Sequence, residues 1–451
     1  MRRGFRVLVC VAALALMSAL ALMSATQARA NPLDAFGFGA RASALGSAYS
    51  AVAQDSAANY YNPAGLARSD ALRIDLGYQF ARPYVEVSGQ PQPLLDTRGL
   101  QAGVLLPGTL MGVRFAFGVG LFLPDQHVTR IRVLSVDMPR LHMYDNRTQR
   151  LHLSANVAVQ VYRGLYVGGG LTFMSRSSGT VYLRGRVGIS DPERSELSAS
   201  VEQNLFAIRY PQAGLLWEAT RNLSFALVYR HRFALDLEQG FQIDAQVADP
   251  GQRPVVEKGT LREVARAADL FQPWQVVAGA AARFGRWQVS FDATFARWSE
   301  QPVPAAVFTL DLDIGKLTDL VKLPKSKEYP PVGFRDVLIP AVGVEWKALE
   351  GAGPLTLLVR AGYRYEGSPV PSQEGDTSLG DADKHIVSFG LGADLLGFTK
   401  VLQKPLSIDG FVGLTSLEKR VFRKADPRSE VGDFTVSGLV VQTGLSARFA
   451  F

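Results

Sequence analysis

The 451-residue sequence has a single cysteine, Cys10, and only 20% of its residues are charged. One cysteine excludes a disulfide-bonded scaffold. The low charge, combined with a hydrophobic content of 47%, excludes an intrinsically disordered chain. The net charge of +7 includes four arginines among the first 30 residues, and the small excess that remains is spread along the chain rather than gathered in a patch, which argues against a nucleic-acid partner.

A long apolar run occurs only at the N-terminus. Three early arginines precede an apolar run from residue 7 to residue 23, and Ala28-Arg29-Ala30 follows as a small-x-small cleavage site. We therefore expect residues 1–30 to be a secretory signal peptide that is removed on export, with an uncleaved membrane anchor as the alternative. Beyond residue 30 no apolar stretch of about 18 residues remains, so the exported chain has no candidate transmembrane helix.

The apolar residues of the exported chain alternate instead. From Val113 to Leu123, large apolar side chains occupy every second position, with Arg114, Gly118 and Gly120 among the residues between them. A period of two over a dozen residues predicts a long strand with one apolar face and one small or polar face. Fourteen segments show this pattern, near residues 72–81, 99–107, 112–123, 149–162, 164–175, 203–218, 222–237, 273–284, 287–299, 334–349, 354–366, 384–397, 405–420 and 434–451.

The connections between these segments alternate in length. Short turns follow the even-numbered segments, and long loops are expected near residues 82–98, 124–148, 176–202, 238–272, 300–333, 367–383 and 421–433. An even number of long strands with short turns at one end is typical of a bacterial outer-membrane barrel; a soluble sandwich is the alternative. Lipid offers no hydrogen bonds to a free sheet edge, so the sheet must close. We therefore predict an all-β fold, a 14-stranded antiparallel transmembrane β-barrel over residues 71–451, in the cell outer membrane of a Gram-negative-type bacterium.

Residues 31–70 do not alternate and are rich in small side chains. Asn62-Pro63 predicts a helix start, because asparagine caps a helix and proline suits its first position. The segment is too short for a domain and too apolar for a free tail. Strand side chains alone cannot fill the lumen of fourteen strands, so we expect residues 31–70 to form a small helical plug, the hatch, inside the barrel.

The hatch sequence resembles the FadL family of outer-membrane transporters for long-chain fatty acids and other hydrophobic compounds. The resemblance rests on Gly39-Ala40-Arg41 through Ser50, on Asp55 to Asn59, and on Asn62-Pro63-Ala64. It implies a fourteen-stranded barrel closed by a hatch. By the same resemblance Asn62, Pro63 and Ala64 shape a kinked hatch segment near the ligand, and Phe36 and Phe38 approach the binding pocket. The motif continues as Gly65-Leu66, a form that also occurs in related barrels acting as secretion shuttles.

Two of the long loops carry apolar stripes at helical spacing. Leu261 and Phe271 belong to one stripe, and Leu317 and Leu320 belong to the other. We expect two amphipathic helices whose apolar faces form a groove that captures a hydrophobic ligand. Packing of the two loops on each other is the alternative.

Two arginines are candidates for binding a charged ligand group. Arg360 and Arg364 lie on the inward face of one predicted strand, where a fatty carboxylate would pair with an arginine in a partly dry pocket. The alternative is that they pair with Glu345 or Asp75 and hold the hatch in place.

The sequence offers little for catalysis. His152 and Ser154 share the lumen face of a strand, so they point away from membrane phospholipid, and we expect no enzyme activity. The other histidines are scattered, which argues against a metal site. The glycines of residues 390–394 lie on a predicted strand without a following helix, so no nucleotide or other cofactor is expected.

These features predict passive uptake of a hydrophobic small molecule, a fatty acid or a hydrocarbon, through a barrel in contact with outer-membrane lipid. We expect the barrel to be a monomer. Removal of apolar surface from water supplies the driving force, at about 0.8 kcal/mol per buried CH₂ group. The alternative from another functional class is a structural or secretion-shuttle barrel that binds partner proteins through its outer loops.

Overall fold

The structure is a computed structural model that describes residues 32–127, 138–141, 143–144, 150–188, 196–248, 254–303, 306–313, 315, 318, 330–350, 354–375, 377–397, 404–429 and 431–451. The expected signal peptide lies outside this part of the chain. The helical segments are α2 (Pro32–Phe36), α3 (Ala40–Ala44), α4 (Ala58–Tyr61), and the 3₁₀ turns η1 (Pro63–Arg68) and η3 (Trp298–Glu300). Among the described residues, no helix has the length and apolar character needed to cross a membrane.

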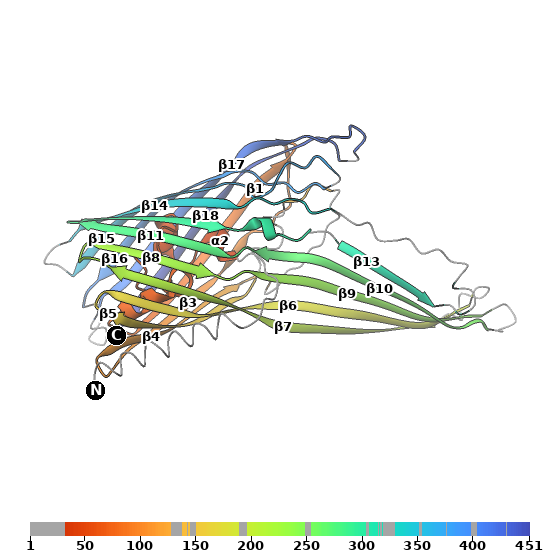
Figure 1. Cartoon of the computed structure of the whole chain (residues 1–451), viewed down its shortest axis with the longest axis horizontal. Coiled ribbons are helices and arrows are strands. Elements are labelled where there is room, and N and C mark those ends of the chain that lie inside the picture. The colour runs from red at the N-terminus through yellow and green to blue at the C-terminus, as the bar shows by residue number, and fades with distance from the viewer. Residues whose placement is uncertain are drawn as a thin grey trace.

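Fourteen strands form a closed antiparallel ring (Figure 1). The ring closes where β1 pairs with β18, from Arg73↔Ala450 to Val87↔Val436. This closure confirms the predicted barrel and leaves no free sheet edge at membrane depth. The ring strands are β1 (Arg73–Val87), β3 (Thr97–Leu110), β4 (Val113–Pro124), β5 (His152–Tyr162), β6 (Leu165–Gly188), β7 (Glu196–Glu218), β8 (Leu223–Arg230), β11 (Gln275–Phe284), β12 (Trp287–Ala296), β14 (Val337–Leu349), β15 (Leu355–Glu366), β16 (Lys384–Leu395), β17 (Leu406–Phe422) and β18 (Phe434–Ala450).

Side chains alternate between the two faces of the wall, as the sequence pattern predicts. In β17, Val412 and Leu414 are 53% and 46% exposed on the outside, whereas Asp409 and Phe411 between the outward positions are buried inside. Exposed apolar side chains on a barrel exterior are the surface that lipid covers. At the short-turn end, Trp287 and Trp346 face each other across β12 and β14 with stacked rings 5.5 Å apart. They mark a membrane interface there.

Several strands continue beyond the ring at the long-loop end (Figure 1). The upper halves of β6 and β7 join β9 (Phe233–Ala248), β10 (Pro254–Gln272) and β13 (Ala306–Asp313) in a projecting sheet. The segments predicted as loops 176–202 and 238–272 are therefore largely strand. The only other strand of the described part is the two-residue β2 (Gln90–Pro91), which pairs with β1.

The predicted amphipathic helix containing Leu261 and Phe271 is wrong. Both residues belong to β10, and Leu261 has a cross-strand partner on each side, Ile243 of β9 and Leu312 of β13. Pairing on both edges satisfies the backbone of β10 through neighbouring strands, and this overrides a local apolar pattern that also fits a helical period.

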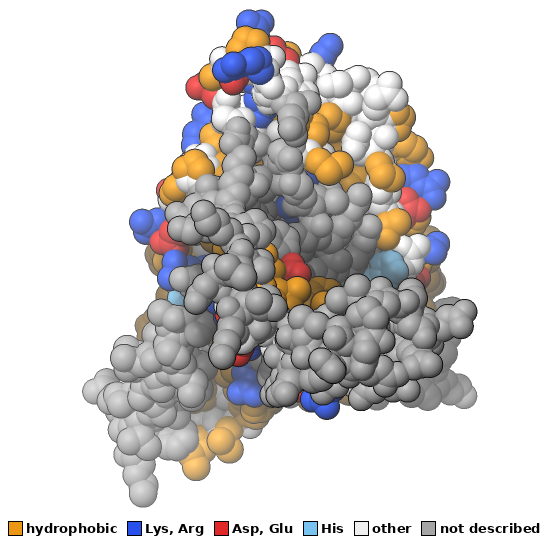
Figure 2. Space-filling view, turned by 90° about the vertical axis from the view of Figure 1, so that its right-hand side faces the viewer, with side chains coloured by type: hydrophobic (Ala, Val, Ile, Leu, Met, Phe, Trp, Pro, Cys, Tyr) orange, Lys and Arg blue, Asp and Glu red, His pale blue; other side chains and the backbone are white. Residues whose placement is uncertain are grey.

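The hatch fills the lumen at the level of the ring. Leu45, Tyr49 and Leu66 are fully buried, and the ring of Tyr49 packs edge-on against Tyr61 at 5.3 Å. Small hatch residues share one apolar core with inward side chains of the wall, among them Leu105 and Leu216. The helical plug predicted from the small-residue composition is thus part of the barrel core. Figure 2 looks onto the long-loop end and shows hydrophobic and acidic side chains within the hollow above it.

Candidate ligand-binding site

The Asn62-Pro63-Ala64 segment is the turn through which the hatch is attached to one wall. Asn62 is fully buried; its Oδ1 accepts from the Ala64 N–H at 3.1 Å, which caps η1 as the sequence predicts. Its Nδ2 donates to the carbonyl of Ser50 at 3.0 Å and to that of Leu215 on β7 at 3.2 Å. One side chain therefore joins two hatch turns to the barrel.

Two wall glycines allow this close approach. A Cβ atom on Gly214 would lie 2.1 Å from Oδ1 of Asn62, and one on Gly168 would lie 2.5 Å from the carbonyl carbon of Pro63. Any larger residue at these positions would push the hatch away from β6 and β7.

Buried charges hold the hatch to the opposite wall. Arg41 of α3 binds Glu345 of β14, which also accepts from Arg360 of β15 at 2.6 Å. Arg360 in turn binds Asp409 of β17 at 2.5 Å. Two carboxylates therefore compensate the charge of Arg360. This agrees with the alternative in which Arg360 pairs with Glu345 and holds the hatch in place.

A second set of ion pairs adjoins these and is centred on Arg448. Arg448 of β18 donates to Asp55 of the hatch and to Asp75 of β1, each at 2.8 Å. Burial opposes ionisation of Asp55, but the charges of Arg448 and Arg41 outweigh it and keep the pKa of this carboxyl below its usual range. Asp55 therefore stays ionised at neutral pH and attaches the hatch electrostatically.

The hatch also has an anchor on β12. Both carboxylate oxygens of Asp292 accept from the hatch: Oδ2 from the N–H groups of Tyr49 and Ser50 at 3.0 and 2.9 Å, and Oδ1 from the Ser50 hydroxyl at 2.6 Å. With Asn62 and Arg41, this gives the hatch polar attachments on three sides of the wall. The body of the hatch is thus fixed, and free space lies above it.

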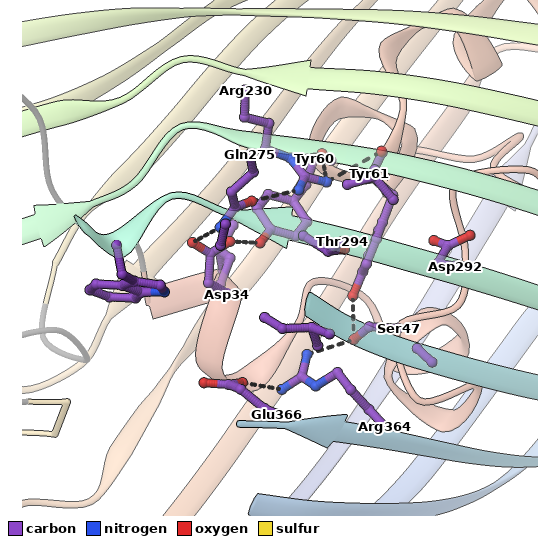
Figure 3. Close-up of a pocket in the computed structure, with 16 residues that line it drawn as sticks. Asp34, Ser47, Tyr60, Tyr61, Arg230, Gln275, Asp292, Thr294, Arg364 and Glu366 are labelled. Carbon is purple, nitrogen blue, oxygen red and sulfur yellow. Dashed lines mark hydrogen bonds and ion pairs between the residues drawn. The ribbon is translucent and has the colours of Figure 1, made fainter. Parts of the chain in front are cut away.

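A cavity lies between the hatch and the wall formed by β8, β11, β12, β14 and β15. Its lining mixes apolar, aromatic and charged side chains (Figure 3). The lining residues are Leu33, Asp34, Ser47, Tyr60, Tyr61, Arg230, Gln275, Val277, Asp292, Thr294, Ala296, Trp298, Ile339, Ala341, Arg364 and Glu366.

Arg230 and Asp34 form a hydrogen-bonded set on one side of this cavity. The Arg230 guanidinium lies 4.6 Å from the centre of the Tyr60 ring and donates to the carbonyl of Tyr60 and to Gln275. Gln275 donates to Asp34 at 3.0 Å, and the Tyr60 hydroxyl also donates to Asp34. Burial and the Asp34 charge raise the pKa of the Tyr60 phenol well above its usual value, so Tyr60 remains a neutral donor.

Arg364 projects into the cavity from the other side and is held loosely. Its guanidinium reaches the carbonyl of Ala35 at 3.2 Å, the Ser47 hydroxyl at 3.5 Å and Glu366 at 3.8 Å. Its buried Nε has no hydrogen-bond partner among the described residues. Such a cation retains donor capacity for a ligand, in contrast to Arg360 four positions earlier.

The aromatic residues predicted to contact the ligand lie in different places in the structure. Phe36 lines a small adjoining cavity together with Arg364, so the structure brings these two residues together. Phe38 is buried in the hatch core and faces a different small cavity, beside Arg41. Phe271 is buried against Trp298, which lines the main cavity.

The remaining predicted contacts lie away from the cavity. Leu261 is in the projecting sheet, and Leu317 and Leu320 fall outside the described residues. Sequence reasoning missed Arg230, Gln275 and Asp34. Arg230 had a usable signal, since it is a charged residue on the inward face of an alternating strand.

The structure gives His152 and Ser154 no common chemistry. Ser154 donates weakly to the carbonyl of Gly120 at 3.4 Å, and His152 packs edge-on near the Tyr60 ring at 6.3 Å. In the part of the chain that is described, no cluster of His, Cys, Asp and Glu side chains could hold a metal ion.

Comparison with known proteins agrees with this architecture. A family model described as "Outer membrane protein transport protein (OMPP1/FadL/TodX)" matches residues 19–451. No curated protein sequence matches the chain.

Solved barrels share the fold at low sequence identity. A FadL homologue of Pseudomonas aeruginosa is 16% identical with a TM-score of 0.56, over 94% of this chain and 100% of the other. The toluene transporter TodX of Pseudomonas putida is 17% identical with a TM-score of 0.54, over 94% and 100%. The monoaromatic hydrocarbon channel CymD is 16% identical with a TM-score of 0.53, over 92% and 97%. These similarities establish the fold.

Proposed function

The chain belongs to the outer membrane protein transport family (OMPP1/FadL/TodX), whose members carry hydrophobic compounds across the outer membrane, and from that premise we propose that it takes up amphiphilic hydrophobic molecules, long-chain fatty acids among them. Uptake is passive. The ligand leaves water for apolar surface and then enters the cavity above the hatch.

The incompletely bonded Arg364 is the observation that supports an amphiphile. A carboxylate bound to its Nη groups would form charge-assisted hydrogen bonds in a mostly buried site. The remainder of the chain would contact Leu33, Val277 and Ile339 on the cavity wall. The main cavity and its neighbour both include Arg364, so the polar end can lie at the junction while the apolar end extends into either cavity.

A monoaromatic hydrocarbon is the second ligand class. Tyr60, Tyr61 and Trp298 place three aromatic rings on the cavity wall, and such rings accept flat apolar ligands. TodX and CymD carry ligands of this class according to their descriptions. Such a ligand would not need Arg364, which separates the two possibilities.

The test is uptake of labelled long-chain fatty acid by a bacterial host that lacks its own channel. Intact protein and Asn62→Ala are compared at equal surface expression, with labelled toluene as the second substrate. We expect fatty-acid uptake with the intact chain and less with Asn62→Ala, because the hatch loses three hydrogen bonds at that residue.

Two outcomes would reject the proposal. Toluene uptake without fatty-acid uptake would assign the barrel to hydrocarbons. No uptake of either substrate by a folded, surface-exposed barrel that co-purifies with a stoichiometric protein would favour the shuttle alternative, with the projecting sheet as its docking surface. We also propose that the barrel acts as a monomer surrounded by lipid.

A further inference from the structure

The outside of the barrel wall has a deep apolar groove that no part of the uptake route uses. It lies on β1 and β15–β18, is widely open to the outside and is lined mainly by apolar side chains. Phe389, Leu391 and Leu445 form its sides and are 62%, 67% and 61% exposed. This exposure is higher than that of most outward wall residues, and the position between Leu391 and Leu445 carries no side chain.

That position is Gly410 of β17, whose cross-strand partners are Leu391 and Leu445. A Cβ atom at Gly410 would meet Leu445 at 3.6 Å and the carbonyl of Gly444 at 3.8 Å, which are ordinary contacts. Its φ is not in the left-handed region. The backbone therefore has room for a Cβ atom here, and the glycine leaves an open floor. By contrast, a Cβ atom on the nearby inward Gly390 would lie 2.4 Å from Ala44.

The groove faces the membrane and does not open into the lumen. The strand ladders behind it run unbroken from Ser407 to Leu417 against both neighbours. Its occupant must therefore come from the hydrocarbon of the bilayer.

Its depth indicates the leaflet. Gly410 lies four residues above Leu406, the first residue of β17 at the short-turn end. At about 3.3 Å per residue and a tilt of about 40°, this is about 10 Å above the strand end, less than half of an apolar band about 25 Å tall. Short turns face the periplasm in barrels of this kind, so the floor of the groove lies in the periplasmic leaflet.

A lysine lies below the groove at the level of the head groups. Lys404 lies two residues before Leu406, the first residue of β17, and binds Asp70 at 3.0 Å, with side chains 45% and 65% exposed. An ammonium group has three donors, and Asp70 takes one of them. A phosphate can take the others.

We propose that this groove is a binding site for one acyl chain of a phospholipid of the periplasmic leaflet, whose phosphate lies at Lys404. The site is independent of the uptake cavity, because a complete strand ladder separates them. The bound acyl chain would fill the hollow in this apolar surface. It would also stabilise the wall where β18 pairs with β1 and closes the ring.

The test uses the full barrel reconstituted in vesicles of phosphatidylethanolamine with a trace of the same lipid carrying a diazirine at the end of one acyl chain. After illumination, cross-linked peptides are quantified. We expect cross-links concentrated on β16–β18 relative to other outward positions. Gly410→Leu fills the floor and should reduce them about tenfold, whereas Ala278→Leu, an outward position on β11, should leave them unchanged.

A second pair of substitutions covers the case in which Gly410→Leu fails to fold, as judged by heat-modifiable migration. Leu391→Ala with Leu445→Ala removes both sides of the groove and should reduce the same cross-links, and Lys404→Gln should weaken retention of the lipid. Even labelling around the barrel, or unchanged labelling in both groove variants, would overturn the proposal. So would cross-links between two barrels across this face.

Discussion

Arg41 of the hatch and Glu345 of β14 form a two-pronged ion pair, with Nε–Oε2 and Nη2–Oε1 distances both 2.9 Å. The pair is buried, so neither charge is solvated by water, and each is stabilised by the other instead. Glu345 also accepts from Arg360, which leaves its carboxylate between two guanidinium groups. The hatch is thus held by charges that cannot be removed singly without leaving a buried charge uncompensated.

Arg41→Gln should loosen the hatch. Removal of one partner of a buried ion pair costs about 3–5 kcal/mol, here reduced because Arg360 still binds Glu345. We expect ion conductance in planar bilayers to rise from a small, steady value to frequent larger openings. Glu345→Gln should behave similarly, and the double variant should be less leaky than the sum of the two, because neither charge is then left alone. Additive effects in the double-mutant cycle would show that the pair is not coupled.

Acid should release the hatch only well below neutral pH. Burial alone would raise the pKa of Asp55, but Arg448 and Arg41 lower it below the ordinary value of about 3.9. A lowered pKa gives stability that is fully present above the unfolded-state value and is lost as the pH falls through the folded-state value.

The part of the conductance that depends on Asp55, taken as the difference between the intact barrel and Asp55→Asn, should therefore be constant between about pH 8 and pH 5 and change only below about pH 4. Recording single-barrel conductance against pH measures this. Asp55→Asn should be leakier at neutral pH and lose part of the acid response. A transition between pH 5 and pH 8 would mean that another group controls the hatch.

A side chain in place of Gly214 should prevent the hatch from packing against β7. A Cβ atom there would lie 2.1 Å from Oδ1 of Asn62, and overpacking of this kind costs about 1–3 kcal/mol. We expect Gly214→Ala to lower the midpoint of thermal unfolding and to reduce uptake. Gly413→Ala is the matched control, because that inward glycine has its nearest neighbour at 3.6 Å. Equal effects of the two substitutions would show that the loss comes from the strand rather than from the hatch.

The parts of this fold that follow from short-range rules could be read from the sequence. Alternation over a dozen residues predicts the wall strands because a pleated strand has a period of two, and Asn62-Pro63 predicts the cap because both residues act on their own backbone. The projecting sheet could not be read in this way. Leu261 lies in a segment that fits two periods, and only pairing with Ile243 and Leu312, which are distant in sequence, selects the strand.

The candidate site also divides into features that the sequence predicts and features that only the fold produces. Inward arginines could be found from alternation, but their roles depend on which neighbours the ring brings close. Arg360 and Arg364 are equivalent in the pattern; Asp409 of β17 reaches Arg360, whereas Arg364 meets Ala35 and Ser47 of the hatch at longer distances. Arg230 contacts the site only because α4 of the hatch lies against β8, a contact that no local pattern contains.

Arg364→Gln should separate the two ligand classes. Glutamine keeps much of the length and hydrogen bonding of arginine but removes the charge that a carboxylate would use. A hydrogen bond to a charged group contributes about 1.5–3 kcal/mol, so we expect fatty-acid affinity to fall about 10- to 100-fold. Binding of the corresponding fatty alcohol should change little. Affinity is measured by titrating purified barrel with a fluorescent fatty acid and displacing it with each compound.

Arg283→Gln is the control for this substitution. Arg283 is also an inward arginine, but it donates to Gln288 at 2.9 Å and does not line the cavity. Its loss should leave both affinities unchanged. If Arg364→Gln weakens acid and alcohol equally, the arginine shapes the cavity without recognising charge. If neither compound is affected, the polar end of the ligand binds elsewhere, and the set formed by Arg230, Gln275 and Asp34 becomes the next group to substitute.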